Sequence, residues 1–121
     1  MEETLFNILG NPVAYISYDM GNAIYLWDGR PVAYLEPDKT IYGFNGHHLG
    51  WYVNGQVRNL HGEIAGFNRL AADVYTSYEP YKPYKHYQPY RRYKECQHYQ
   101  PYFGYVKSKE SLSQFLLGGA V

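Results

Sequence analysis

Short apolar segments recur four times in the first half of the chain, and a glycine interrupts each of them. The four segments align without gaps on Gly10, Gly29, Gly46 and Gly62. A β-branched or leucine residue stands five places before each glycine, and a small residue followed by an aromatic one stands four and five places after it. This regularity predicts a four-fold internal repeat over about residues 4–68.

Each repeat is typical of a β-hairpin. Asp28-Gly29 and Asn45-Gly46 are dipeptides that favour a two-residue type I′ turn, in which both central residues have positive φ. The flanking residues are β-branched and aromatic, as a half-buried strand favours. Asn54-Gly55 predicts a further tight turn between the third and fourth units. Residues 1–74 are therefore expected to form a mainly β domain of four antiparallel hairpins.

The position four places after each glycine holds only small residues, namely Ala14, Ala33, Gly50 and Gly66. Four hairpins around a common axis would crowd that position, which predicts a pseudo-four-fold arrangement. Because neighbouring strand residues point to opposite faces, the next residues, Tyr15, Tyr34, Trp51 and Phe67, would form a ring on the other face. This ring either fills the core, the simpler interpretation, or is an exposed collar that binds sugars, bases or proline-rich peptides.

Several motifs within the repeats are distinctive. They are VAY at residues 13–15 and 32–34, IYLWDG at 24–29, IYGFNG at 41–46 and HLGW at 48–51. With these motifs the chain resembles the 4-fold β-flower proteins, an uncharacterised bacterial family, over about residues 4–68. The resemblance implies a compact arrangement of four hairpin petals and no particular activity, and it leaves the second half of the chain outside.

Tyrosine recurs at every third residue from Tyr75 to Tyr105, and Cys96 takes one place in this register. The tyrosines between these ends are Tyr78, Tyr81, Tyr84, Tyr87, Tyr90, Tyr93, Tyr99 and Tyr102. Proline precedes four tyrosines of the series, so a helix is excluded. Polyproline II, with three residues per turn, would place all tyrosines on one face. Residues 75–107 are thus predicted to be an extended tail. If this tail docks on the head, its tyrosines are expected to be substantially buried there.

Such a tail is too long to lie straight along its own head. It spans roughly 95 Å as polyproline II, whereas a domain of this size is about 30 Å across. The tail must therefore bend, wrap or reach other molecules, and the proline-free stretch 91–98 is the expected bend. Disorder is the alternative interpretation.

Charge separates the two halves although the formal net charge is zero. Residues 1–74 hold eight acidic and four basic side chains, and residues 75–121 hold three acidic and seven basic ones. The tail is expected to dock on its own head or on another copy of the chain; an anionic partner such as nucleic acid is the second possibility. Residues 108–121 predict a short helix with Ser108 as its N-cap and an apolar stripe of Leu112, Phe115 and Leu116.

The sequence holds no set of side chains that predicts catalysis, and we expect no enzyme, cofactor or metal. There is no glycine-rich phosphate loop and no GxSxG motif. His47 and His48 are neighbours in a predicted strand, so they point to opposite faces and cannot share a metal ion. Cys96 is the only cysteine, and we interpret it as a substitution of tyrosine at one position of the repeat rather than as a thiol site.

Three classes of function remain, and a non-catalytic binding or assembly module is the favoured one. The first alternative is a tyrosine-rich structural or coat component. The second is single-stranded nucleic-acid binding through the basic tail, although a tyrosine spacing of about 9 Å exceeds the rise between stacked bases. No apolar stretch approaches the ~20 residues of a membrane span, and no secretory leader is recognised at residues 1–20, so the expected location is cytoplasmic.

Overall fold

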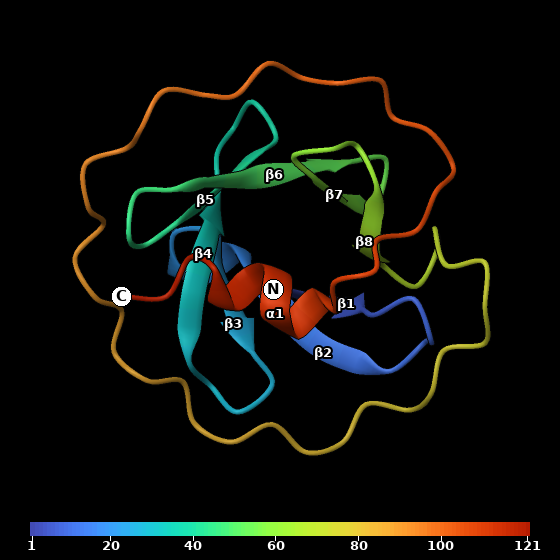
Figure 1. The fold of residues 1–121 in the computed structure, drawn as a ribbon. Helices are drawn as coiled ribbons and strands as arrows, with labels where there is room; N and C mark the ends of the chain where they lie inside the picture. The colour runs from blue at the N-terminus through green and yellow to red at the C-terminus, as the bar shows by residue number, and fades with distance from the viewer.

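Eight antiparallel strands form a closed barrel in which each strand pairs with its sequence neighbours and β8 closes onto β1 (Figure 1). The computed structural model describes all residues, 1–121. The strands are β1 (Glu2–Phe6), β2 (Pro12–Ser17), β3 (Ala23–Leu26), β4 (Pro31–Leu35), β5 (Thr40–Gly43), β6 (His48–Val53), β7 (Gln56–Asn59) and β8 (Ile64–Phe67). The prediction of a mainly β fold built from four hairpins is confirmed, and closure of the sheet removes its free edges.

The turns within the hairpins differ from the predicted type I′ turns. In the β3–β4 hairpin Gly29 has a φ of 96°, but Asp28 has no positive φ. The N–H of Gly29 donates to the Leu26 carbonyl at 2.9 Å, and the Leu26 N–H donates to the Arg30 carbonyl at 2.8 Å. This is a three-residue loop with a glycine bulge, which needs only one residue of positive φ. The type I′ prediction is therefore wrong here, and for the same reason at Asn45-Gly46.

The turn between the third and fourth units agrees with its prediction. Asn54 and Gly55 have φ values of 54° and 76°, as the two central residues of a type I′ turn require. This turn joins β6 to β7. The connection between β2 and β3 includes a short 3₁₀ helix, η1 (Tyr18–Met20).

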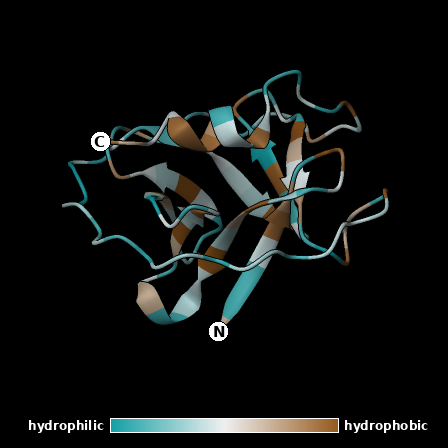
Figure 2. Ribbon diagram, turned by 90° about the horizontal axis from the view of Figure 1, so that it is seen from below, coloured by the Kyte–Doolittle hydropathy of each residue, from teal (hydrophilic) through white to brown (hydrophobic).

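One end of the barrel is covered by the helix α1 (Leu112–Leu117), and the N terminus lies at the other end (Figure 2). Leu112, Phe115 and Leu116 are buried against the interior side chains of the strands, as the apolar stripe predicts. The helix begins later than expected, because its N-cap is Ser111, whose hydroxyl accepts from the Gln114 N–H at 3.2 Å. The buried Ser108 instead lies beside the barrel.

The small residues of the repeat make room for this helix and for neighbouring strands. Ala14 and Ala33 are fully buried inside the barrel. A Cβ on Gly50 would lie 3.1 Å from the ring of Phe115 and 1.9 Å from the Arg58 carbonyl oxygen. A Cβ on Gly66 would lie 2.9 Å from Leu112. At these two glycines the space is taken by α1 and the adjacent strand backbone rather than by the equivalent residues of other hairpins.

Residues 75–105, which we call the belt, contain no helix or strand and circle the whole barrel (Figure 1). The curvature is spread around this circle, so the prediction of a single bend at residues 91–98 is wrong. After the belt, Lys107 forms a parallel bridge with Ile64 before the chain turns into α1.

Candidate functional site

The belt is attached to the hairpin turns by its backbone at intervals of nine residues. The N–H groups of Ser77, His86 and Glu95 each donate at 2.9 Å to the carbonyl of a turn glycine. Their acceptors are Gly10, Gly29 and Gly46, respectively. At the fourth turn, Nη1 of the Arg58 guanidinium donates to the carbonyls of both Gly62, at 2.9 Å, and Gly104, at 2.6 Å. Three tyrosine periods of the belt thus span one unit of the four-fold barrel.

The turn glycines have a second role in this attachment. A Cβ placed on Gly10, Gly29, Gly46 or Gly62 would lie 2.0, 2.1, 2.1 or 2.4 Å from the carbonyl oxygen of Tyr75, Tyr84, Tyr93 or Tyr102. All four glycines also have positive φ, which other residues rarely adopt. Glycine is therefore needed both for the turn and for the close approach of the belt, and only the first need could be inferred from the sequence.

The prolines of the belt share one register with the residues whose backbone N–H groups donate to the barrel. Besides the three attachment residues, Arg92 donates its N–H to the Phe44 carbonyl and His98 donates its N–H to Nδ1 of His48, both at 2.9 Å. All of these donors occupy the place before a tyrosine or before Cys96. The remaining equivalent places include Pro80, Pro83, Pro89 and Pro101, which have no N–H to donate.

Most of the residues that follow a tyrosine contact the barrel, and four of them are cations that lie over aromatic rings. The Arg91 guanidinium carbon is 4.0 Å from the centre of the Tyr34 ring, and Lys82 Nζ is 4.4 Å from the centre of the Tyr15 ring. Farther along, the Phe103 ring packs against Trp51 with centroids 5.7 Å apart. Just after the belt, two residues beyond Tyr105, Lys107 lies 5.8 Å from the centre of the Phe67 ring. Cation–π contacts of this kind favour a well-defined belt position.

The circle of four aromatic residues predicted from the repeat lies between the barrel and the belt. Tyr15, Tyr34, Trp51 and Phe67 are 1–4% exposed. They point away from the barrel interior and belong to a second buried layer, in which Tyr15 also stacks on Tyr25. The structure therefore presents no exposed collar at these four positions.

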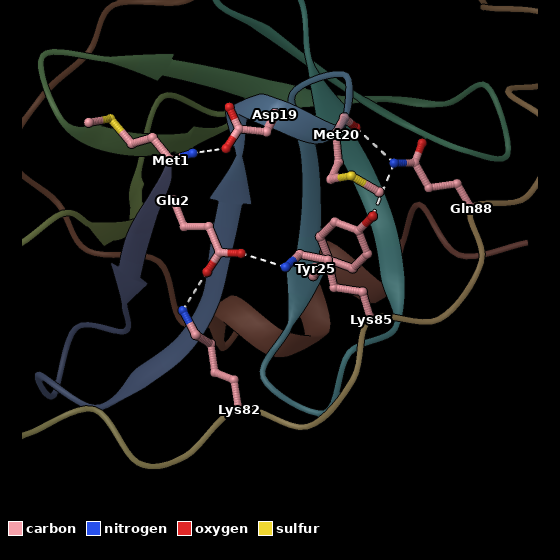
Figure 3. Close-up of polar contacts among 8 residues, drawn as sticks. All are labelled: Met1, Glu2, Asp19, Met20, Tyr25, Lys82, Lys85 and Gln88. Atoms are coloured by element: carbon pink, nitrogen blue, oxygen red, sulfur yellow. Dashed lines mark hydrogen bonds and ion pairs between the residues drawn. The ribbon is translucent and has the colours of Figure 1, made fainter.

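Ion pairs complete the contact between the acidic barrel and the basic belt. Lys82 and Lys85 both bind the Glu2 carboxylate, at 2.6 and 2.5 Å (Figure 3). Gln88 donates to the Tyr25 hydroxyl at 3.0 Å in the same region. Burial alone would raise the pKa of Glu2, but the two lysines outweigh burial and hold this pKa below its usual value. Lys94 pairs with Glu36 and, with the charges reversed, Glu79 of the belt pairs with Arg69. Just after the belt, Lys107 pairs with Asp73.

The belt tyrosines face outward. All ten, from Tyr75 to Tyr105, are 81–100% exposed, so the prediction that their rings are buried against the head is wrong. A three-residue period turns only one side-chain position in three toward the barrel, and over most of the belt the residue after a tyrosine takes that position. The sequence carried a signal for this choice, because Lys82, Lys85, Arg91 and Lys94 all follow a tyrosine directly. Cys96, in the same register, is also exposed.

His48 of β6 and His98 of the belt lie next to each other. His98 is close in sequence to Cys96, which takes a tyrosine position of the belt. His48 is buried, its Nε2 lies 3.1 Å from the Gly50 carbonyl, and its Nδ1 accepts the His98 N–H. Burial lowers the pKa of His48. His47 points to solvent, and no three His, Cys, Asp or Glu side chains lie close enough together to hold a metal ion.

Together these features define a class of small protein in which a four-hairpin barrel carries an encircling belt. The family profile described as 4-fold beta flower protein matches residues 3–116, and the chain belongs to this family. The match includes the belt and most of α1, which lie beyond the motifs that carry the resemblance at about residues 4–68. Comparisons with curated proteins and with solved structures found no significant match. None of the helices has the length and apolar character needed to cross a membrane.

Proposed function

We propose that this protein is a non-catalytic binding or assembly module whose contact surface is the outward face of the belt. The observation that carries the proposal is the exposure of all ten belt tyrosines. Exposed aromatic rings in such number are characteristic of interaction surfaces. Tyrosine supplies a large, amphipathic contact area and loses little side-chain entropy on binding, which is why it is frequent in binding sites.

The backbone of the belt supports this proposal because it holds the tyrosines in place before any partner arrives. Hydrogen bonds at Ser77, His86 and Glu95 attach the belt to three of the four turns. A flexible tail would lose conformational entropy on binding, whereas an attached belt has lost it during folding. The barrel then serves as a rigid hub that sets the spacing of the rings.

A tyrosine-rich structural component is the second candidate, and the same exposure favours it. Single-stranded nucleic-acid binding has less support, because Lys82, Lys85, Lys94 and Lys107 are already paired with carboxylates of the same chain. Few free cations therefore stand beside the tyrosines to attract phosphates. The absence of an enzymatic activity and a cytoplasmic location remain part of this proposal; cell fractionation tests the location.

Site-specific photo-crosslinking in living cells tests the proposal. A photoreactive phenylalanine analogue is placed at Tyr84 or Tyr90 in the belt, and at Leu70 as the control. Leu70 is 96% exposed and lies in the connection between β8 and the belt. We expect discrete cross-linked products from the two belt positions and none from Leu70. No product from the belt, or the same products from Leu70, would contradict the proposal.

A further inference from the structure

We propose that the partner of the belt is a second copy of the same chain, with tyrosines of one belt inserted between tyrosines of the other. This inference rests on the proposed function, since it names the partner of the same surface. It draws on the spacing of the rings, on the balance of charge and on the area that two belts can bury.

The spacing of the tyrosines suits insertion of another ring. Successive belt tyrosines are three residues apart, which is about 9 Å along an extended chain with three residues per turn. The rings lie on the outside of the curved belt and are spaced more widely than its backbone, so a ring placed midway between two of them would have its centroid at least about 4.6 Å from each; aromatic pairs prefer about 4.5–7 Å. Another belt carries rings at this same spacing, so several tyrosines can insert together in one register.

The balance of charge permits two copies to approach each other. The formal net charge of the chain is zero, and proteins near zero net charge associate more readily than charged ones. Most belt cations that could repel an identical belt are turned inward, where Lys82 and Lys85 share Glu2 and Lys94 pairs with Glu36. Arg92 is the exception, since it is exposed and forms no ion pair. The outward register therefore consists mainly of neutral phenol rings.

The area of contact predicts weak but repeated association. The belt is curved, so two copies that meet side by side can engage about three tyrosines each, and six rings bury on the order of 900–1,500 Å². Stable complexes bury about 1,200–2,000 Å², which places a single contact at the lower end. Because the belt surrounds the barrel (Figure 1), one molecule can contact several neighbours, and the expected product is an open assembly rather than a closed dimer.

Sedimentation velocity over a wide range of protein concentration tests this inference. We expect the average mass of the full-length chain to rise with concentration beyond that of a dimer, with little effect of salt, because the contact is aromatic rather than ionic. A variant with Tyr81, Tyr84, Tyr87 and Tyr90 replaced by serine removes one side of the belt, while the backbone attachment stays. Its association should weaken at least ten-fold.

Two controls test whether the tyrosine rings, rather than exposed apolar side chains in general, carry the contact. The same four tyrosines replaced by phenylalanine keep the rings and should keep the association. Leu9→Ser with Leu70→Ser removes exposed apolar side chains outside the belt and should change nothing. A full-length chain that stays monomeric at every concentration would overturn the inference, and so would a serine variant that associates as well as the parent.

The photo-crosslinking experiment distinguishes this inference from the proposal beneath it. A belt cross-link with the mass of two chains supports both. A belt cross-link only to other molecules contradicts self-association but leaves the binding module in place. Absence of any belt cross-link contradicts both.

Discussion

The attachment of the belt through backbone N–H groups predicts that proline is harmful at His86, although proline is tolerated at equivalent places such as Pro83. The His86 N–H donates to the Gly29 carbonyl at 2.9 Å. In His86→Pro this donor is lost, and the ring carbon on the proline nitrogen takes its place. The change does not disturb Lys85 locally, because a residue before proline prefers the extended backbone that the belt already has.

The size of the effect follows from two contributions. Loss of a hydrogen bond costs about 0.5–1.5 kcal/mol net, and more if the Gly29 carbonyl stays without a partner. The 2.9 Å separation joins the His86 nitrogen to the Gly29 oxygen, and the proline ring carbon would lie between these two atoms. A carbon needs about 3.3–3.6 Å from a carbonyl oxygen, so the belt must move outward. This movement weakens the neighbouring contacts of Lys85 and Gln88 with the barrel. We expect a total loss of about 2 kcal/mol in the free energy of unfolding.

Urea unfolding and amide hydrogen exchange measure this effect, with Pro83→Ala as the matched control. Pro83 occupies an equivalent place before a tyrosine but donates no hydrogen bond, so its replacement should cost less than about 1 kcal/mol, through the unfolded chain. In His86→Pro we expect faster exchange at Arg92, while Ser77 stays protected at the distant turn. Equal stabilities of His86→Pro and the parent, or a larger loss in Pro83→Ala, would refute the reasoning.

Two further predictions concern a turn glycine and the buried histidine. Gly46→Ala should lower the urea midpoint more than Gly21→Ala, although both residues have positive φ. At Gly46 a Cβ would lie 2.1 Å from the Tyr93 carbonyl oxygen, whereas at Gly21 it would lie 3.0 Å from the flexible end of Arg91. Similar midpoints would contradict the close approach of the belt. Burial lowers the pKa of His48, so the unfolded chain binds a proton at a higher pH than the folded chain does. The stability that the neutral ring contributes should therefore be complete above about pH 6.5 and should decrease as the pH falls below that value. Unfolding free energies at pH 7.5 and 5.5 should differ less in His48→Gln than in the parent, and an unchanged difference would count against this role.

The hairpins could be predicted from the sequence because their signals are local. A turn glycine with β-branched and aromatic flanks specifies a hairpin in each unit, and four gapless copies reveal the symmetry. The apolar stripe of α1 is local in the same sense. The turn type was harder to predict, because Asp28-Gly29 suits both a two-residue turn and a three-residue loop with a glycine bulge.

The belt could be predicted only in part, because its orientation depends on the surface that it covers. A period of three shows that one face carries tyrosine, but the period does not say which face meets the barrel. The face that meets the barrel is decided by Tyr15, Tyr34 and nearby acidic residues such as Glu2. These residues form cation–π contacts and ion pairs with cations that directly follow belt tyrosines. The wrong expectation came from treating aromatic area as the driving force, whereas cation–π contacts, ion pairs and backbone hydrogen bonds hold the belt.

Chemical modification of tyrosine, mapped by mass spectrometry in the folded protein, tests the central claim that an attached belt displays its tyrosines. Early in nitration we expect modification throughout the belt, where the rings are 81–100% exposed, and protection of Tyr15, Tyr25 and Tyr34 beneath it. Burial also raises the pKa of Tyr15 to about 12, so little of the reactive phenolate forms there. Protection of the belt tyrosines would contradict their outward orientation. Early modification of Tyr15, Tyr25 and Tyr34 together with the belt would show that the belt does not cover the barrel.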